Sequence, residues 1–286
     1  MSPRLALTLT FAAPICWSFG GPLIRLAEAD PWTVVFLRSA AMTVVVALAM
    51  LALYGRHAGA KLVGIGRPGI VAGLLMGSTF VLFVFVLQHT SIAHAIVLID
   101  TAPLIAGILA WIWLGERVRA SGWLCLILAV VGNGIMVLGK AGRATLLGDA
   151  LALVVAAAFA LYIVLLRRHR AIDLLPAVLI AGAAACVPAA LLAPALWLPN
   201  TPSLWFGLLS GVALASGTLL FAAAAGHLPA AQSGLIVLLE VVPAVLWAWL
   251  ILDERPSGFE LFGGLAVLTA LAMDQVMRRA TVKPEP

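Results

Sequence analysis

The sequence has little charge. Asp, Glu, Lys and Arg make up 10% of its 286 residues, whereas 64% of the residues are apolar. The core of a soluble domain does not need so large an apolar fraction, and long apolar runs are typical of membrane spans. The scarcity of charge therefore indicates a protein that lies in a lipid bilayer.

The sequence also lacks the motifs of nucleotide-driven and hydrolytic enzymes. It contains no G-x-x-x-x-G-K-[ST] phosphate loop, no H-E-x-x-H metal motif and no G-x-S-x-G nucleophile elbow. We therefore do not expect this chain to hydrolyse ATP. An intramembrane enzyme would need a nucleophile with a base, or a metal site, and stays a remote alternative to a non-enzymatic role.

Cysteine is equally scarce, with three residues in the whole chain. Cys16, Cys125 and Cys186 each lie in an apolar run, which is a poor setting for a disulfide or a reactive thiolate. His89 and His94 are five residues apart and so do not form an i, i+4 metal-binding pair. We therefore expect no metal site and no cofactor.

What the chain does contain is an internal repeat. When the segment from Gly69 to Arg117 is shifted by 138 residues, it aligns with the segment from Gly207 to Arg255. The matching residues of the first copy are Gly69, Gly73, Ser78, Leu82, Phe83, His89, Ala93, Ala110, Trp111, Leu114, Glu116 and Arg117. Such a repeat predicts two similar halves, residues 1–140 and 141–286.

Ten apolar segments are each long enough to cross a bilayer as a helix, which takes about 20 residues. They are residues 5–24, 32–54, 69–88, 93–114, 120–139, 147–166, 174–197, 203–225, 229–252 and 258–277. Arg4 and the segment Ala27-Glu28-Ala29 make the first run resemble a signal peptide, but this run is long enough to span and contains Pro14 and Trp17. We predict an all-α membrane protein of ten transmembrane helices.

Basic residues are unevenly distributed between the two predicted sides of the membrane, and they lie in short connectors, unlike a nucleic-acid-binding surface. With the N-terminus in the cytoplasm, the inner set is Arg4, Arg56, Lys61, Arg67, Arg117, Arg119, Arg167, Arg168, Arg170, Arg278, Arg279 and Lys283, and the outer set is Arg25, Lys140, Arg143 and Arg255. The positive-inside rule then places both termini in the cytoplasm. Because each half has five spans, the second half must be inverted relative to the first.

Small residues recur four positions apart on the third and eighth spans. Gly69, Gly73 and Gly77 share one helical face, and Gly207, Gly211 and Ala215 share the corresponding face of the other span. Such faces let helices approach closely in a membrane. They are either packing grooves or surfaces that slide during transport.

Several motifs resemble those of a known family. They are Trp17-Ser18, Asp30-Pro31 before Phe36-Leu37-Arg38, Ala102-Pro103 with Trp111 through Leu114-Gly115-Glu116-Arg117, Gly148-Asp149, and Glu240 with Pro243 through Asp253-Glu254-Arg255. With ten spans in two halves, they resemble the drug/metabolite transporter superfamily, and within it the bacterial EamA-type exporters. The resemblance covers nearly the whole chain. It implies a multi-pass protein of the bacterial inner membrane, with a central cavity lined mainly by spans one, three, four, six, eight and nine.

The two halves are not in strict register across spans four and nine. Pro103 lies eight residues before Trp111, whereas Pro243 lies six residues before Trp249. Asp100 and Glu240 precede these prolines, and they are counterparts only if the alignment of the two halves shifts by two residues here.

Charged residues within spans are costly, at roughly 3 kcal/mol each on insertion scales, and so usually face protein or water. Arg38 and Asp100 both lie about seven residues from the outer end of their spans, roughly 10 Å deep. We expect them to form an ion pair or to close an outer gate together. The alternatives to a role in transport are a static ion pair that only stabilises the fold, or an Arg38 side chain that extends to the lipid headgroups.

Glu240 lies near the middle of span nine. It is predicted to bind the amino group of a substrate or to carry a coupling proton. The alternative is a protonated structural residue that hydrogen-bonds a neighbouring helix. The other candidate cavity residues offer aromatic faces for apolar bodies and cations, or directed hydrogen bonds. They are Trp17, Ser18, Phe80, Phe83, Tyr162, Phe221 and Gln232.

The favoured function is that of a secondary transporter that exports small amphipathic metabolites by alternating access. The resemblance favours amino acids, including hydrophobic or aromatic ones; a vitamin, a nucleobase or an amine, and import, are the alternatives. A channel would need a continuous polar stripe, which the spans lack. The expected partners are the solute, the lipid bilayer and a coupling proton, without nucleic acid, in a monomer or a homodimer.

Overall fold

The computed structural model describes residues 2–90, 95, 98–116, 119–138, 145–169, 175–193, 201–225, 227–228, 230–252 and 257–281. Regular structure in these residues is α-helix with two short 3-10 turns. The elements are α1 Pro3–Ser18, α2 Gly20–Leu26, α3 Pro31–Tyr54, η1 Gly55–His57, α4 Ala58–Val63, α5 Gly66–His89, α7 Ala102–Leu114, α8 Ala120–Leu138, α9 Leu146–Arg168, α10 Leu175–Leu192, α11 Thr201–Ala225, α12 Ala230–Val237, η2 Leu238–Glu240, α13 Val241–Leu252 and α14 Gly258–Thr281.

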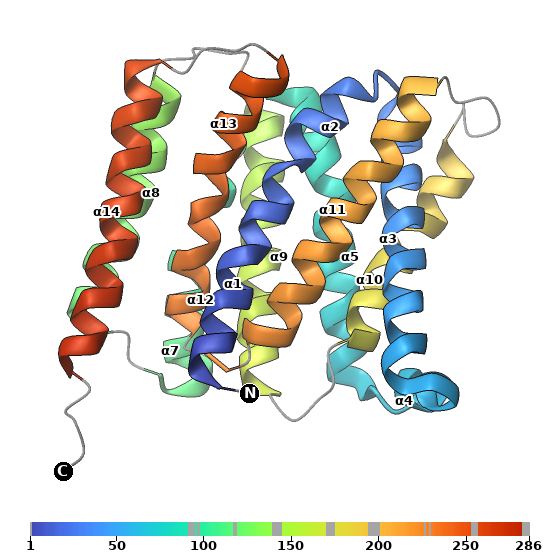
Figure 1. Cartoon of the computed structure of the whole chain (residues 1–286), viewed down its shortest axis with the longest axis horizontal. Helices are drawn as coiled ribbons and strands as arrows, with labels where there is room; N and C mark the ends of the chain where they lie inside the picture. The colour runs from blue at the N-terminus through green and yellow to red at the C-terminus, as the bar shows by residue number, and fades with distance from the viewer. Residues whose placement is uncertain are drawn as a thin grey trace.

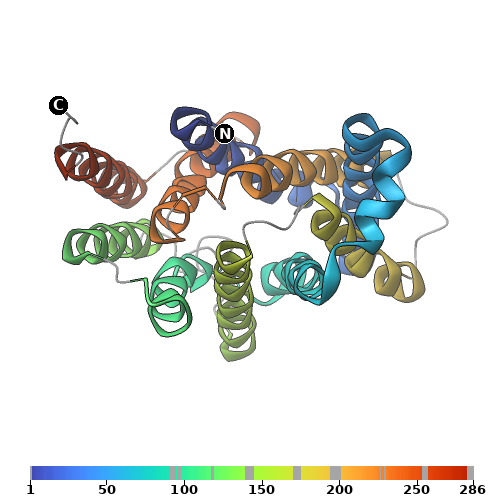
Figure 2. The same cartoon turned by 90° about the horizontal axis from the view of Figure 1, so that it is seen from below.

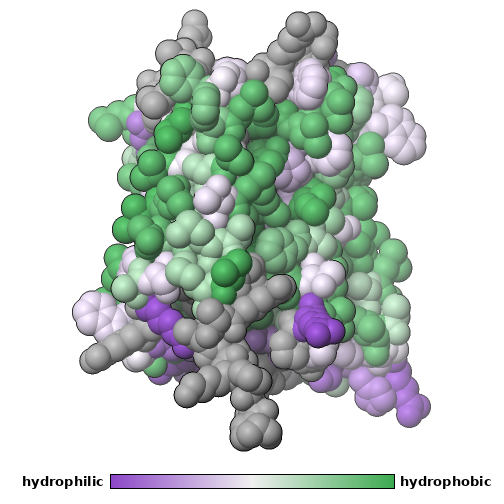
Figure 3. Space-filling model, turned by 60° about the vertical axis from the view of Figure 1, so that its left-hand side comes forward, coloured by the Kyte–Doolittle hydropathy of each residue, from purple (hydrophilic) through white to green (hydrophobic). Residues whose placement is uncertain are grey.

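Six helical segments are long and apolar enough to cross a membrane: Arg4–Leu26, Pro31–Val63, Gly66–His89, Leu146–Arg168, Leu175–Leu192 and Thr201–Ala224. Shorter apolar helices occupy the other four predicted spans: Ala102–Leu114, Ala120–Ile135, Leu235–Ile251 and Leu261–Asp274. Large apolar side chains are exposed on many helices, and Figure 3 shows hydrophobic residues over the middle of one face with hydrophilic ones gathered near its lower end. The chain is an all-α membrane protein, and the count of ten crossings stays a prediction.

The helices stand side by side, and α1 begins on the side of the bundle where α14 ends (Figure 1). Helices α8 and α14 pack together at one end of the molecule, and α3 and α10 pack together at the other (Figure 2). Between these pairs, α1 packs against α11, α5 against α9, α3 against α11 and α5 against α10. The centre of the bundle is therefore built from helices of both halves.

The glycine faces of spans three and eight are sites of close helix packing. A Cβ atom on Gly73 of α5 would lie 2.7 Å from Cβ of Ile180 on α10. On α11, a Cβ atom on Gly211 would collide with the carbonyl oxygen of Arg38, and Gly207 is packed against α3 in a similar way. These contacts support the packing interpretation, and they leave the sliding interpretation untested.

Two predicted spans are interrupted. The first changes from α1 to α2 at Phe19, and the ninth passes through the 3-10 turn η2 between α12 and α13. A proline removes the helical hydrogen bond to the carbonyl four residues earlier and clashes with that carbonyl. Pro22 affects the carbonyl of Ser18 in this way, and Pro243 affects that of Leu239 within η2. Both interruptions therefore follow from a proline one turn later.

Candidate functional site

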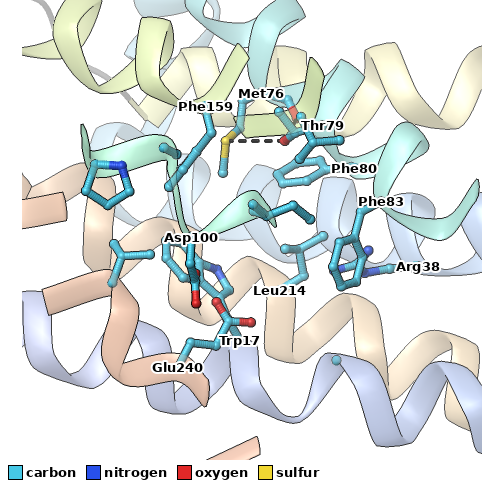
Figure 4. A pocket seen from close by; sticks show the side chains of 16 residues that line it. Trp17, Arg38, Met76, Thr79, Phe80, Phe83, Asp100, Phe159, Leu214 and Glu240 are labelled. Carbon is cyan, nitrogen blue, oxygen red and sulfur yellow. Dashed lines mark hydrogen bonds between the residues drawn. The ribbon is translucent and has the colours of Figure 1, made fainter. Parts of the chain in front are cut away.

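A pocket lies between helices of the two halves (Figure 4). It is lined by Trp17, Gly20, Arg38, Met76, Thr79, Phe80, Phe83, Ile99, Asp100, Ala102, Pro103, Val155, Phe159, Leu214, Val237 and Glu240. Each of the six spans that the family resemblance implied contributes at least one residue, and α3 adds Arg38. The predicted site residues that line this pocket are Trp17, Arg38, Phe80, Phe83, Asp100 and Glu240.

Aromatic rings form much of the pocket wall. The Trp17 ring packs edge-on against Phe159, with 6.2 Å between ring centroids, and its Nε1 donates a hydrogen bond of 3.3 Å to Oγ1 of Thr218 on α11. Phe80 and Phe83, on α5, also line the pocket. Such a wall accommodates an apolar body and stabilises a cation through the ring faces.

Two carboxyl groups point toward the same part of the pocket. Asp100 lies just before α7, and Glu240 is the last residue of η2. Figure 4 shows the two side chains directed toward one another, and their charges interact electrostatically. Carboxyl groups in this arrangement can hold a proton or a cationic group between them.

The two acidic residues occupy equivalent places in their spans. Asp100 lies three residues before Pro103, and Glu240 lies three residues before Pro243. Each stands at a point where regular α-helix is interrupted, because α7 begins only at Ala102 and η2 is a 3-10 turn. Discontinuous helices line the binding sites of many transporters, since their free backbone groups are directed at the solute. The common position supports the two-residue slip between the halves.

Asn133 holds one of these carboxyl groups in place. Its Nδ2 donates a hydrogen bond to Oδ2 of Asp100, and the Asn133 side chain is fully buried on α8. Asn133 was not among the predicted site residues, although an uncharged polar residue inside the apolar fifth span is a signal that could have identified it. Phe159, Met76 and Thr79 were not predicted either, because they resemble ordinary packing residues in the sequence.

No ion pair between Arg38 and Asp100 is found among the described residues, and the acidic residue that acts electrostatically on Arg38 is Glu240. Asp100 is hydrogen-bonded to Asn133, whereas the guanidinium carbon of Arg38 lies 5.6 Å from the ring centroid of Phe83. Among the described residues, Nε and Nη1 of Arg38 have no hydrogen-bond partner. Arg38 is also 6% exposed, so its side chain does not extend to the headgroups. A gating role for the two residues stays a prediction.

Four predicted cavity residues lie outside this pocket lining. The hydroxyl of Ser18 accepts a hydrogen bond of 2.8 Å from Nε1 of Trp247. Tyr162 and Phe221 are buried and pack around Phe159, with ring centroids 6.1 Å from it in each case. Gln232 is buried on α12. Whether these four contact a substrate stays a prediction.

Some family-like motifs have structural roles. Asp30 caps α3, because its carboxylate accepts hydrogen bonds from the backbone N–H groups of Trp32 and Thr33, at 3.0 and 3.1 Å. Gly115 ends α7 with a left-handed φ of 66°. The next residue, Glu116, forms an ion pair of 2.8 Å with Arg167 of α9. The counterpart Asp253-Glu254-Arg255 lies outside the described residues.

Ionisable groups in a pocket that apolar membrane helices enclose are typical of a membrane transporter. The chain belongs to the EamA-like transporter family, whose sequence profile matches residues 4–138 and again residues 146–273.

Relatives and solved structures agree with this assignment. The chain is 26% identical to the pseudopaline exporter CntI of Pseudomonas aeruginosa (strain UCBPP-PA14) over 278 residues, which is 93% of this chain and 94% of that protein. It is 36% identical to a UPF0060 membrane protein of Aeromonas hydrophila over 87 residues, which is 28% of this chain and 72% of that protein. One crystal structure covers 99% of this chain, and the chain covers 100% of it, with a TM-score of 0.82 and 17% identity, which shows the shared fold.

Proposed function

We propose that this protein is a secondary transporter that exports small amphipathic metabolites bearing an amino group. The observation that supports this proposal is the carboxyl pair of Asp100 and Glu240, which faces a pocket walled by aromatic rings. An amino group would bind the carboxyl pair, and an apolar body would pack on the rings. Amino acids with hydrophobic or aromatic side chains fit both features, while other amines and vitamins share only part of this chemistry.

The arrangement of helices supports alternating access by two inverted halves. Two pairings between the halves are equivalent: α1 packs against α11, which are spans one and eight, and α9 packs against α5, which are spans six and three. If the two halves are exchanged, the pairing of α3 with α11 becomes the pairing of α10 with α5. The pairs α3–α10 and α8–α14 each join equivalent spans of the two halves. Two such halves can rock about a site between them and expose it to one side at a time.

The distribution of basic residues supports a location in the bacterial inner membrane with both termini in the cytoplasm. Arg56 and Lys61 belong to η1 and α4, and α4 lies on the side of the bundle where α1 begins (Figure 1). Short connectors rich in Lys and Arg stay in the cytoplasm. The similarity to a bacterial pseudopaline exporter supports the outward direction of transport.

A proton gradient would drive export if the carboxyl pair binds either a proton or the substrate's amino group. A proton that enters the pocket from outside displaces the amino group, and the returning pocket carries the proton inward. The two ligands compete for one pair of groups, so export of one solute is coupled to entry of a proton.

Flux in proteoliposomes tests this function. The purified protein would be reconstituted and assayed with the proteinogenic amino acids and simple amines, with and without a pH gradient. We expect saturable transport of at least one amino-bearing solute, accelerated when the side toward which the solute moves is the more acidic. An absence of transport for the whole panel would contradict the proposal.

A further inference from the structure

Arg38 is a buried charge whose hydrogen-bonding capacity is not fully used by the described residues. Its side chain is 6% exposed, and Nε and Nη1 have no hydrogen-bond partner among the described residues. Glu240 acts on Arg38 electrostatically, but donors of a buried cation that make no hydrogen bond still carry a desolvation cost. The ring of Phe83 covers only one face of the guanidinium and accepts no conventional hydrogen bond. Nε and Nη1 therefore keep hydrogen-bonding capacity that a ligand in the pocket can use.

The position of Arg38 on α3 is firmly fixed. Gly211 of α11 packs directly against the carbonyl group of Arg38, and a Cβ atom on Gly211 would also lie 2.7 Å from Cβ of Ala41. The helix α3 is continuous from Pro31 to Tyr54, so no interruption lets this residue move away from the pocket. The charge is thus held at the pocket by packing.

The guanidinium adjoins the pocket on its Gly20 side. Gly20 and Arg38 both line the pocket, and a Cβ atom on Gly20 would lie 3.7 Å from Nη2 of Arg38. Because Gly20 has no side chain, this edge of the guanidinium keeps room for a ligand atom. Figure 4 shows Arg38 on the far side of the pocket from Asp100 and Glu240.

We propose that Arg38 is the carboxylate-binding subsite of the transport pocket, and that the transported solutes are therefore zwitterions. The solute's carboxylate binds the guanidinium, whose planar donors match carboxylate geometry. Its amino group binds Asp100 and Glu240, and its body lies along Phe80 and Trp17. This inference rests on the proposed function, because it identifies the class of solute that the same pocket binds.

The opposite charges in the pocket also explain how selectivity arises. A solute with only an amino group would leave the guanidinium uncomplemented, and a solute with only a carboxylate would leave the carboxyl pair uncomplemented. A site with buried polar groups rejects ligands that leave those groups unpaired. A zwitterion is the simplest solute that satisfies both sides.

The test compares Arg38→Gln with the wild type in proteoliposomes, using three solutes that share an aromatic ring and an amino group: phenylalanine, phenylalanine methyl ester and phenethylamine. The wild type should transport phenylalanine most efficiently. Arg38→Gln should lower the transport efficiency of phenylalanine by about 10- to 100-fold, the effect of losing a hydrogen bond to a charged group. Transport of the ester and the amine should not fall and should rise if anything, because neither has a carboxylate to bind and the variant removes the charge that they leave unpaired. Arg56→Gln, in an exposed connector, serves as the matched control.

The outcomes separate this inference from the proposed function. If Arg38→Gln transports phenylalanine as well as the wild type, or if the wild type prefers the ester or the amine, the zwitterion proposal is wrong while the transporter assignment stands. If the wild type transports none of the amino acids and amines, both are wrong. If Arg38→Gln loses all three solutes equally, with an unchanged unfolding temperature, Arg38 is a general structural or gating residue and the subsite is contradicted.

Discussion

The acidic and basic sides of the pocket differ in how the chain holds them. Asp100 and Glu240 stand where helices are interrupted, three residues before a proline. Arg38 stands inside the continuous helix α3, against the tightly packed Gly211. The acidic side thus has backbone that can adjust, whereas the basic side is fixed. We infer that the carboxyl pair changes its geometry between the two states of a transport cycle, while Arg38 keeps its place.

The largest effect is expected at the acidic side. Replacing Glu240 by Gln removes a charge that would bind the solute's amino group or the coupling proton, and we expect transport to fall by about 100-fold. Acceleration by a pH gradient should disappear in any residual flux. Glu28→Gln, an exposed carboxyl outside the pocket, is the matched control. If Glu240→Gln keeps wild-type flux and wild-type pH dependence, Glu240 is a structural residue.

The contact of Gly211 on α11 with the backbone of Arg38 can be disrupted by substitution. Gly211→Ala would place a methyl group against the carbonyl of Arg38, and we expect a loss of about 1–3 kcal/mol of stability from this overpacking. Phenylalanine transport should fall with it. Gly134→Ala on α8 is the control, because a Cβ atom there has no neighbour within 4 Å. Equal unfolding temperatures for the two variants would show that α3 is not held in place by this contact.

A substitution of Asn133 distinguishes the acidic side of the pocket from the basic side, because it affects only the acidic side. Asn133→Ala frees the carboxylate of Asp100, and we expect about tenfold weaker transport of phenylalanine, its methyl ester and phenethylamine alike. This common loss differs from the carboxylate-specific loss expected for Arg38→Gln. Gln88→Ala, an exposed amide on α5, is the control. A loss confined to phenylalanine would assign Asn133 to the carboxylate instead.

The smallest effect is expected away from the pocket, at the ion pair of Glu116 and Arg167. Their side chains are 32% and 13% exposed, and partly exposed pairs contribute at most about 1 kcal/mol. Glu116→Gln should therefore change the transport rate by less than about threefold, with unchanged selectivity. A loss of tenfold or more in the rate would show that this pair between α7 and α9 controls the conformational change.

The class of fold followed directly from the sequence, because 64% apolar residues and long apolar runs leave few alternatives to a helical membrane bundle. Buried charges were also informative, since Arg38, Asp100 and Glu240 all line one pocket. The partners of these charges could not be predicted, because Asn133 and Phe83 meet them only through packing between distant spans.

The rotation of each helix about its own axis could not be predicted either. The register of apolar residues does not tell which side of a uniformly apolar helix faces the centre, so it could not predict that Phe159 lines this pocket while Tyr162 and Phe221 pack against Phe159. The interruption after Ser18 could have been predicted, since Pro22 follows two glycines. Pro14 does not end α1, which continues past this proline to Ser18.

The most direct test is an experimental structure of the protein with the amino acid that it transports most efficiently. We predict that the solute's carboxylate contacts the guanidinium of Arg38 and that its amino group lies within hydrogen-bond distance of Asp100 or Glu240. A solute bound in the opposite orientation, or outside the pocket between the two halves, would contradict this account.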